Sequence, residues 1–199
     1  MQSHKRTFIN SGMFTVLFGL FLLSFSAGED WPGKRNKQKM EKEASKIWKE
    51  TSYSVHELKD LNKKFTESYK TIYKIQENNK TLGYAYIGRV NTCRPGGCSA
   101  PAKNNFTGGN YEFFDYLLIL DKSLAVKQVE ILNYNATHGY EISSKRWLKQ
   151  FLGYEGNKTI KYGKDIQAIS GATISANSIT DDIENTVNKL KTLKKQKHL

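Results

Sequence analysis

The sequence predicts an α+β fold in which an antiparallel sheet of hairpins is flanked by helices. Apolar and polar side chains alternate from Tyr69 onward, which is typical of β-strands. Turn-forming residues interrupt these runs at short intervals, as they do in hairpins. Near both ends of the chain, apolar side chains recur at helical spacing instead. With 199 residues, of which 38% are hydrophobic, the chain can bury one ordinary core, so we expect a single domain with appendages.

Segment 1–27 has the pattern of a secretory signal peptide. Two basic residues, Lys5 and Arg6, precede the apolar block 13–27, and acidic residues appear only after it. The block has 15 residues, whereas a membrane-spanning helix needs ~20. We expect the segment to be cleaved, and an uncleaved N-terminal anchor is the alternative. Either form implies an exported domain, periplasmic or on the outer face of the cytoplasmic membrane.

Positive charge is concentrated toward the two ends of the chain, whose formal net charge is +12. Segment 28–65 is rich in lysine, and Met40, Ala44 and Ile47 recur in it at helical spacing, so we expect a basic amphipathic helix. The tail 194–199 is basic as well. Such ends suit an anionic membrane surface or an acidic partner protein, although solvated ends without a partner are equally compatible with the sequence. We expect no nucleic-acid partner for an exported chain.

The predicted domain, residues 66–193, begins with two hairpins. Residues 69–76 and the segment "LGYAYIGRV" flank an "ENNKT" turn and form the first hairpin. The segments "YEFFDYLLIL" and "LAVKQVEILNY" flank a "DKS" turn and form the second, which is apolar enough to be central. Between the hairpins lies the irregular segment 91–110, whose length favours a functional or mobile connection.

The two cysteines of the chain, Cys93 and Cys98, lie in this irregular segment. The residues between them include Pro95 and two glycines, which allow a tight bend. In an oxidising compartment, this spacing favours a small disulfide loop. A redox-active or metal-binding pair is the alternative. No histidine lies nearby and two ligands are too few for a structural metal, so we predict no metal site.

After the second hairpin, a polar turn leads into a short helix. The turn, residues 137–139, could grip a ligand where the chain leaves the strand. The helix is expected to be capped by Ser143 or Ser144 and to end at Gly153. Its predicted apolar side consists of Trp147, Leu148, Phe151 and Leu152. His138 has no carboxylate or cysteine partner in view, so we interpret it as an exposed turn residue rather than a catalytic base.

The segment "QAISGATISANSIT", residues 167–180, is rich in hydroxyl side chains and leads into a long helix. The buried face of that helix is marked by Ile179, Ile183, Val187, Leu190 and Leu193. Ser178 and Asp181 have the spacing of a capping box. Thr173 is therefore expected just upstream of the helix, and Gly171 lets the backbone approach a ligand. Free amides and the helix dipole favour a phosphate there, and simple helix capping is the alternative.

The string "SGATIS" at residues 170–175 resembles the flavinylation motif of the FMN-binding domain family. That family includes flavin-carrying subunits of the Rnf and Na+-pumping NADH:quinone reductase complexes and small exported proteins. The resemblance extends over roughly residues 69–193, because the turn and helix that precede the motif also look like the family's. It implies an FMN-binding-domain-like fold and a phosphoester between FMN and the hydroxyl of Thr173, which a flavin transferase forms from FAD.

The same resemblance implies which residues surround the cofactor. Within the motif, the phosphate would be held by Ser170, Gly171, Ala172 and Ser175. On the opposite wall, the family turn would contribute Thr137 and Gly139. The chain departs from the family at Gln167, where aspartate is usual. It also departs at Ala136 and His138, within a turn that reads Glu-Thr-Pro-Gly in the complex subunits.

No acid, base or nucleophile that acts on a substrate stands out, so the resemblance favours an electron carrier over a stand-alone enzyme. We expect a flavoprotein with covalent FMN that passes electrons between a membrane redox protein, or a quinone-linked complex, and an extracytoplasmic acceptor. Two alternatives remain. One is an FMN-dependent reductase with its own small substrate, and the other is a flavin-free binding module that keeps the fold, which Gln167 favours.

Overall fold

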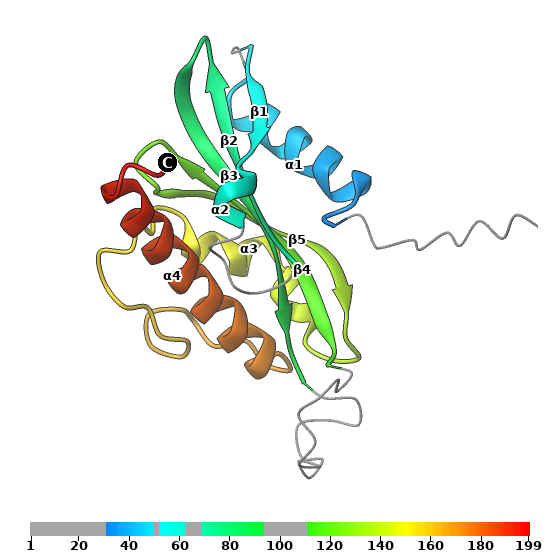
Figure 1. Ribbon diagram of the computed structural model, residues 1–199. Coiled ribbons are helices and arrows are strands. Elements are labelled where there is room, and N and C mark those ends of the chain that lie inside the picture. The colour runs from blue at the N-terminus through cyan, green and yellow to red at the C-terminus, as the bar shows by residue number, and fades with distance from the viewer. Residues whose placement is uncertain (1–30, 50–51, 63–68, 94–110) are drawn as a thin grey trace, which may run out of the picture.

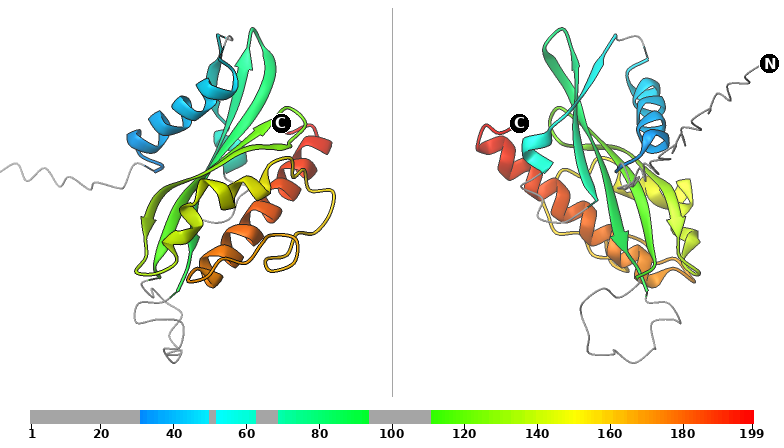
Figure 2. Two further views of the ribbon diagram at one scale, coloured as in Figure 1. Left: turned by 180° about the vertical axis from the view of Figure 1, so that it is seen from behind. Right: turned by 45° about the vertical axis from the view of Figure 1, so that its right-hand side comes forward.

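The computed structural model describes residues 31–49, 52–62, 69–93 and 111–199. Within these residues, the fold is a five-stranded antiparallel sheet with helices on both faces (Figure 1, Figure 2). The predicted α+β class is therefore confirmed. The predicted signal peptide lies outside the described residues. None of the described helices combines the length and the apolar character needed to cross a bilayer.

The sheet is a meander, because each strand pairs with the strand that precedes it in the chain. Its strands are β1 (Ser54–Glu57), β2 (Lys70–Glu77), β3 (Lys80–Asn91), β4 (Phe113–Asp121) and β5 (Val126–Asn135). The turn between β2 and β3 places Asn78 and Asn79 at φ of 45° and 65°. Asparagine tolerates this left-handed conformation better than most residues. Both predicted hairpins, β2 with β3 and β4 with β5, are confirmed.

One face of the sheet is covered by the long helix α4 (Thr173–Lys195) and the short helix α3 (Lys145–Leu148). The predicted apolar face of α4 is buried, with Ile179, Ile183 and Val187 fully inaccessible to solvent. It packs against side chains from β3 and β4, namely Tyr84, Tyr86, Phe114, Tyr116, Leu118 and Leu120. This packing brings the N-terminus of α4 to the lower end of the sheet in Figure 1, beside the end of β5.

The other face of the sheet is covered by α1 (Lys34–Ile47) (Figure 1). Met40 and Ala44 are buried against aliphatic side chains of the central strands. An ion pair joins this helix to β5, since Lys39 Nζ lies 2.8 Å from a carboxylate oxygen of Glu130. The basic amphipathic helix predicted for this part of the chain is thus confirmed. The short helix α2 (Lys59–Asn62) precedes β2.

The start of the long helix differs from the prediction. Helix α4 begins at Thr173, so Thr173 is its first residue rather than a residue upstream of it. Ser178 and Asp181 therefore lie inside the helix and do not form a capping box. The reason is tertiary, because Ser175 and Ala176 are buried against the core. Their burial outweighs the weak helix propensity of this hydroxyl-rich segment.

The predicted short helix is divided into three pieces, η1 (Tyr140–Ser143), α3 and η2 (Lys149–Phe151). Ser144 occupies the N-cap position of α3, although its side chain makes no capping hydrogen bond. Three of the four predicted apolar side chains are buried, but Leu152 is 44% exposed. The chain becomes extended at Leu152 and then left-handed at Gly153, which turns the leucine outward.

The predicted disulfide falls partly outside the described residues. Cys93 is disulfide-bonded, whereas Cys98 lies in the part of the chain that is not described. The bond between these two residues therefore stays a prediction, which counting of free thiols in the denatured, unreduced protein checks. The predicted boundaries at 28–65, 66–193 and 194–199 also stay predictions.

Candidate functional site

The turn after β5 and the first turn of α4 lie against each other. A Cβ atom at Gly139 would lie 2.5 Å from Ser175 Oγ and 2.6 Å from the hydroxyl oxygen of Tyr134. Gly139 has a φ of 93°, so both its conformation and its surroundings require glycine. The structure therefore brings together the two segments, 137–139 and 170–175, that the sequence predicted to share a site.

Tyr134 links these two segments. Its hydroxyl donates a 2.6 Å hydrogen bond to the carbonyl of His138 and lies 2.9 Å from Ser175 Oγ. Burial raises the pKa of Tyr134, and the negative charges of Glu141 and Glu112 raise it as well, although the hydrogen bond with Ser175 acts in the opposite direction. The phenol therefore keeps its proton at neutral pH and remains a hydrogen-bond donor.

The N-terminus of α4 presents unpaired amides and a free hydroxyl. Ala172 is the N-cap residue and supplies no side-chain cap, and the first turn contains no acidic residue. The first intrahelical bond runs from the amide of Ala176 to the carbonyl of Ala172, at 2.8 Å. The amides of residues 173–175 thus have no acceptor within the helix, and the Thr173 side chain is exposed. This end can bind an anion through its amides and the helix dipole.

The predicted phosphate neighbours differ in what they can offer a ligand. Gly171 and Ser170 are both exposed, so the Gly171 backbone and the Ser170 hydroxyl are accessible to a ligand. Ala172 is buried and can contribute only its backbone. Ser175 is also buried, and its side chain is engaged with Tyr134. Ser175 therefore supports the turn from behind, while its amide faces the end of the helix with the two amides before it.

The loop that leads to Ser170 is fixed by backbone contacts. The indole of Trp147 donates a 2.7 Å hydrogen bond to the carbonyl of Gln167, whose amide donates a 2.7 Å hydrogen bond to Gln150. The amide of Ile169 donates a further bond to Tyr162. Because its side chain is exposed, Gln167 holds the loop through its backbone alone.

An open cleft of about 420 Å³ lies just before the start of β4 and at the end of β5, and one of its lining residues, Tyr134, contacts Ser175 in the first turn of α4. Its lining consists of Tyr111, Glu112, Tyr134, Asn135, Ala136 and Thr137. Thr137 donates a hydrogen bond to the carboxylate of Glu112. Thr137 lines this cleft, whereas Gly139 contacts Ser175 directly and does not line it.

Apolar side chains are unusually exposed around this end of the molecule. Tyr140 is 67% exposed, Ile174 38% and Tyr111 37%, although all three are large and apolar. Tyr140 packs edge-on against Tyr134, whose ring is stacked on buried Phe114. Exposed aromatic surface next to an anion-binding helix end is the combination that a nucleotide-like ligand with an aromatic ring would cover.

Residues 113–188 match the family model described as the FMN-binding domain. This span runs from β4 to α4 and contains both segments of the site. Residues 113–188 belong to the FMN-binding domain family. The chain is thus a flavin-binding protein, with an FMN-binding domain formed by the second hairpin and the helices that follow it. A search among curated proteins finds no match to this chain.

The geometry of the FMN-binding domain suits the phosphate of FMN. The amides of the first turn of α4 offer hydrogen-bond donors to a phosphate, and the hydroxyl of Thr173 is exposed among them. Gly171, at a φ of 81°, exposes its backbone beside them. A carboxylate is also near, because a Cβ atom at Gly171 would lie 3.0 Å from Glu141 Oε1. That side chain comes from a 3-10 turn at the surface and is exposed, so it can swing away from an incoming anion.

Several residues of the site were missed by the sequence prediction. Tyr134, Tyr111 and Asn135 lie at or next to strand ends, where the alternating pattern marks them only as parts of a sheet. Glu141 gave no signal, because an isolated acid in a polar turn has no distinctive pattern. The one available signal was the clustering of aromatic residues at the start of β4 and the end of β5, which the antiparallel register places next to each other.

Proposed function

We propose that this FMN-binding domain carries FMN covalently on Thr173 and relays electrons outside the cytoplasm, between a membrane redox partner and an extracytoplasmic acceptor. The observation that supports it best is the exposed hydroxyl of Thr173 at the first position of α4, among amides without intrahelical acceptors. A valine of similar shape offers no such oxygen. The hydrogen bond between buried Ser175 and half-buried Tyr134 keeps this terminus in place.

The attachment step is an exchange of groups on phosphorus. A flavin transferase would join Thr173 Oγ to the FMN phosphorus of FAD, the pyrophosphate bond would break, and AMP would leave. The hydroxyl proton would pass to a base of the transferase. Neither an oxidant nor a reductant is needed. Because Thr173 is exposed at the tip of the helix, the folded domain can present it to a second enzyme.

The residues of this chain hold and orient the phosphate. The amides of residues 173–175 would donate hydrogen bonds to its oxygens, with Ser170 and the Gly171 backbone adding donors from the loop. Gly139 permits the close approach of the turn after β5, and Thr137 lines the adjoining cleft. When bound, the flavin supplies reversible electron transfer. We assign no general acid or base to this chain.

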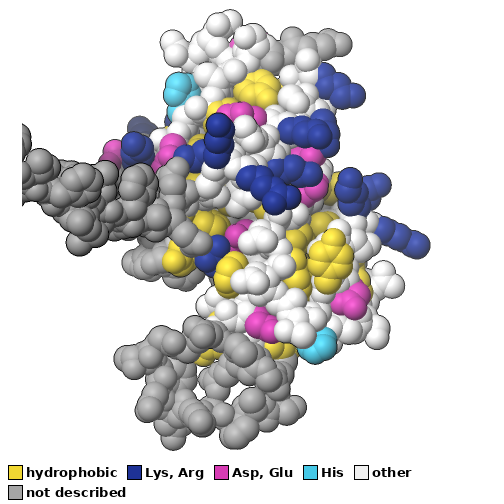
Figure 3. All heavy atoms as spheres, turned by 90° about the vertical axis from the view of Figure 1, so that its right-hand side faces the viewer, with side chains coloured by type: hydrophobic (Ala, Val, Ile, Leu, Met, Phe, Trp, Pro, Cys, Tyr) yellow, Lys and Arg dark blue, Asp and Glu magenta, His cyan; other side chains and the backbone are white. Residues whose placement is uncertain are grey.

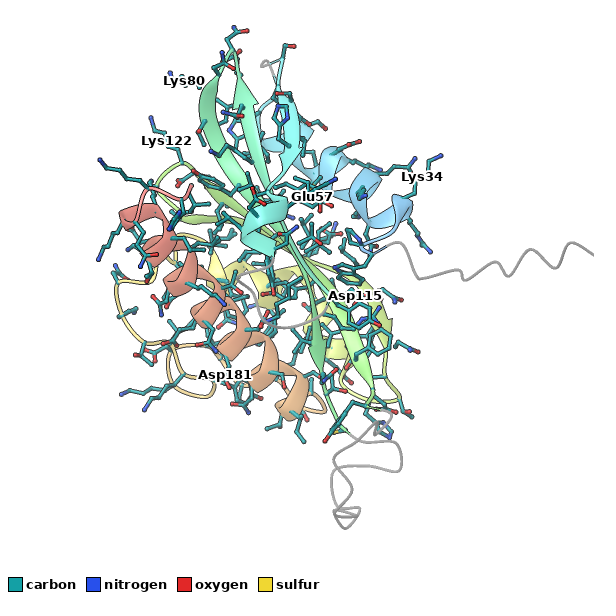
Figure 4. All side chains as sticks on the ribbon, in the orientation of Figure 1. Lys34, Glu57, Lys80, Asp115, Lys122 and Asp181 are labelled. Atoms are coloured by element: carbon teal, nitrogen blue, oxygen red, sulfur yellow. The ribbon has the colours of Figure 1, made fainter. Side chains whose placement is uncertain are left out.

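The proposed location and partners rest on charge and on the N-terminal sequence. Segment 1–27 has the pattern of an export signal. On the outer side of α1, basic side chains are exposed or half-exposed, namely Lys34, Arg35, Lys42 and Lys46. Figure 3 shows lysine and arginine side chains gathered on one face of the molecule, and Lys34 points away from the sheet in Figure 4. Such a face suits an anionic membrane surface, which would keep the flavin near a membrane redox protein or a quinone-linked complex.

Intact mass measurement tests the covalent link. The full chain is expressed with an exported flavin transferase, and its periplasmic fraction is denatured and weighed. We expect wild type to gain the mass of an FMN phosphoester and to fluoresce in a denaturing gel, and the Thr173→Val variant to lose both while remaining folded. Flavin that stays on denatured Thr173→Val protein would show that the link lies elsewhere. The mass also reports whether segment 1–27 is removed.

A reductase with its own small substrate is the second candidate, and the open cleft at the end of β5 is the observation that favours it. Turnover with an added electron acceptor at a saturating, substrate-dependent rate would support the reductase. A rate that rises linearly with acceptor concentration supports the electron carrier. Purified protein without flavin absorbance, despite an active transferase, would support a flavin-free module.

A further inference from the structure

We infer that the cleft at the ends of β4 and β5 seats the isoalloxazine ring, with Tyr111 and Tyr134 against its aromatic surface and Asn135 at its polar imide edge. This inference rests on the proposed attachment at Thr173. It goes further by giving the ring a place and by naming residues that control its potential.

The cleft lies close to Thr173, the proposed attachment residue. Tyr134, which forms part of its wall, is hydrogen-bonded to Ser175, two residues after Thr173. The ribityl phosphate chain separates the ring of FMN from its attachment atom, so the ring lies beside the helix terminus rather than on it. The cleft lies just before β4 begins and where β5 ends, and Tyr134 connects it to the first turn of α4.

The size of the cleft and the two tyrosines in its lining fit a flat aromatic ligand. Its volume is about 420 Å³, within the range of small-molecule and cofactor sites. Tyr111 is 37% exposed, and a ring placed against it would remove this apolar surface from water. Tyr134 is held from behind by Phe114, whose ring is parallel to it within 5° at a centroid distance of 5.7 Å. The wall of the cleft is therefore preorganised.

Asn135 matches the polar edge of the ring. Its amide carries a donor and an acceptor side by side, and the imide edge of isoalloxazine carries an N–H flanked by carbonyl oxygens. Asn135 is exposed at the last position of β5, where its backbone is paired with Phe113. The strand thus fixes the position of the side chain, which can form such a pair with the ring.

Glu112 places a negative charge at the same cleft. Its carboxylate accepts a hydrogen bond from Thr137, which fixes it among the lining residues. A negative charge opposes the addition of electrons to a nearby ring, because it raises the energy of the more negative, reduced form. Glu112 is therefore expected to lower the midpoint potential of the bound flavin.

The alternative binding position for the isoalloxazine ring is the exposed face of Tyr140, at the same end of the molecule as Ile174. Tyr140 offers one ring surface, whereas the cleft offers walls from two strand ends together with an amide. Tyr140 does not line the cleft, so substitutions at the two places distinguish the two seats.

The test compares flavinylated variants whose adduct on Thr173 is first verified by intact mass. Tyrosine in contact with a flavin quenches its fluorescence by electron transfer. Tyr111→Leu is therefore expected to raise the fluorescence yield of the native protein, with Tyr134 still quenching in part, and to raise it more than Tyr140→Leu does. The reverse pattern, or no change in either variant, overturns the inference.

Two isosteric substitutions give a second readout, the midpoint potential from a redox titration. Glu112→Gln removes a negative charge and is expected to shift the potential upward. Asn135→Asp adds one and removes a donor, so the expected shift is downward. Glu77→Gln, at the end of β2 beside the turn into β3, is the matched control and should leave the potential unchanged. Unshifted potentials in both cleft variants overturn the inference.

The outcomes separate this inference from the proposed function. A wild-type protein without the FMN mass contradicts the attachment at Thr173, and the inference falls with it. If the protein is fully flavinylated but none of the cleft substitutions changes its fluorescence or its midpoint potential, only the proposed position of the ring is contradicted. Far-UV circular dichroism of each variant confirms that the fold is retained.

Discussion

Tyr116 on β4 donates a 2.8 Å hydrogen bond to Asp182 on α4. Tyr86 donates to the same carboxylate oxygen, and Lys70 contacts the other at 2.7 Å. Both tyrosines are fully buried, so these polar contacts join the centre of the sheet to the helix within an apolar core. They fix how far α4 is displaced along the sheet and hence where Thr173 lies relative to the turn after β5.

Tyr116→Phe should lower the free energy of unfolding by about 1–2 kcal/mol, because it removes a buried hydrogen bond to a charged group. Urea denaturation followed by circular dichroism measures the change. Tyr140→Phe is the matched control, since its ring is 67% exposed, and its effect should stay within about 0.5 kcal/mol. Equal effects of the two substitutions would contradict the stabilising role of the Tyr116 contact.

The burial of Tyr116 also makes the stability of the fold depend on pH in the alkaline range. Burial, and then the charge of Asp182, raise the pKa of Tyr116 well above its ordinary value of 10.0. The folded state thus favours the protonated phenol. This contribution is complete below pH 10 and is lost as the pH rises toward the higher pKa of the folded state. In unfolding curves recorded at several pH values, wild type should lose stability above about pH 10 more steeply than Tyr116→Phe.

Gly139→Ala should destabilise the fold and reduce flavin attachment. The new Cβ atom would collide with Ser175 Oγ at 2.5 Å, in addition to the strain of a left-handed residue. Gly153→Ala is a matched control, because Gly153 is also left-handed but a Cβ atom added there would meet nothing within 4 Å. The control should cost about 1–2 kcal/mol for the strain alone, and Gly139→Ala at least about 1 kcal/mol more. Equal costs would contradict the close contact.

Thr173→Ser should keep part of the attached flavin. The hydroxyl oxygen survives, and serine is accepted at a helix start, but the side chain loses the methyl group that restricts its rotation. We expect a flavinylated fraction between those of wild type and Thr173→Val, measured as the ratio of adduct to free chain by intact mass. A Thr173→Ser variant with no adduct at all would indicate that the transferase requires the methyl group of threonine.

Gln167→Asp should leave folding unchanged and attachment equal or higher. The contacts of Gln167 with Trp147 and Gln150 use its backbone, so the substitution disturbs neither. The introduced carboxylate restores the residue that is usual in the family. Time courses of flavinylation for the two proteins, with thermal unfolding as the control for folding, measure the effect. A slower reaction of the aspartate variant would contradict this expectation.

The elements of the fold that depend on local patterns could be predicted from the sequence. The alternation from Tyr69 and the asparagine turn define the first hairpin, and the apolar spacing from Ile179 defines the buried face of α4. The start of α4 could not be predicted in this way. Ser178 and Asp181 have the spacing of a cap, and only the burial of Ala176 against the sheet shows that the helix begins upstream of them, at Thr173.

The candidate site, too, could be predicted only where a local pattern in the sequence marks its residues. Thr173 and Gly171 were predicted because a short string of residues resembles a known motif. Tyr134 was not, because an aromatic residue in an alternating strand is indistinguishable from a core residue until its partner Ser175, 41 residues away, is placed. Long-range contacts of this kind leave no trace in local spacing.

The order of elements along the chain determines when the flavin site comes into existence. A chain leaves the ribosome with its N-terminus first, and the meander lets each new strand join the strand made just before it. Helix α4 follows all five strands, so Thr173 acquires its surroundings only when the last element docks. Under the proposed attachment at Thr173, the cofactor would be added in a maturation step that acts on a finished domain. Under the same proposal, a chain truncated before α4 could complete its sheet but would lack Thr173, so it could not be a substrate for a flavin transferase.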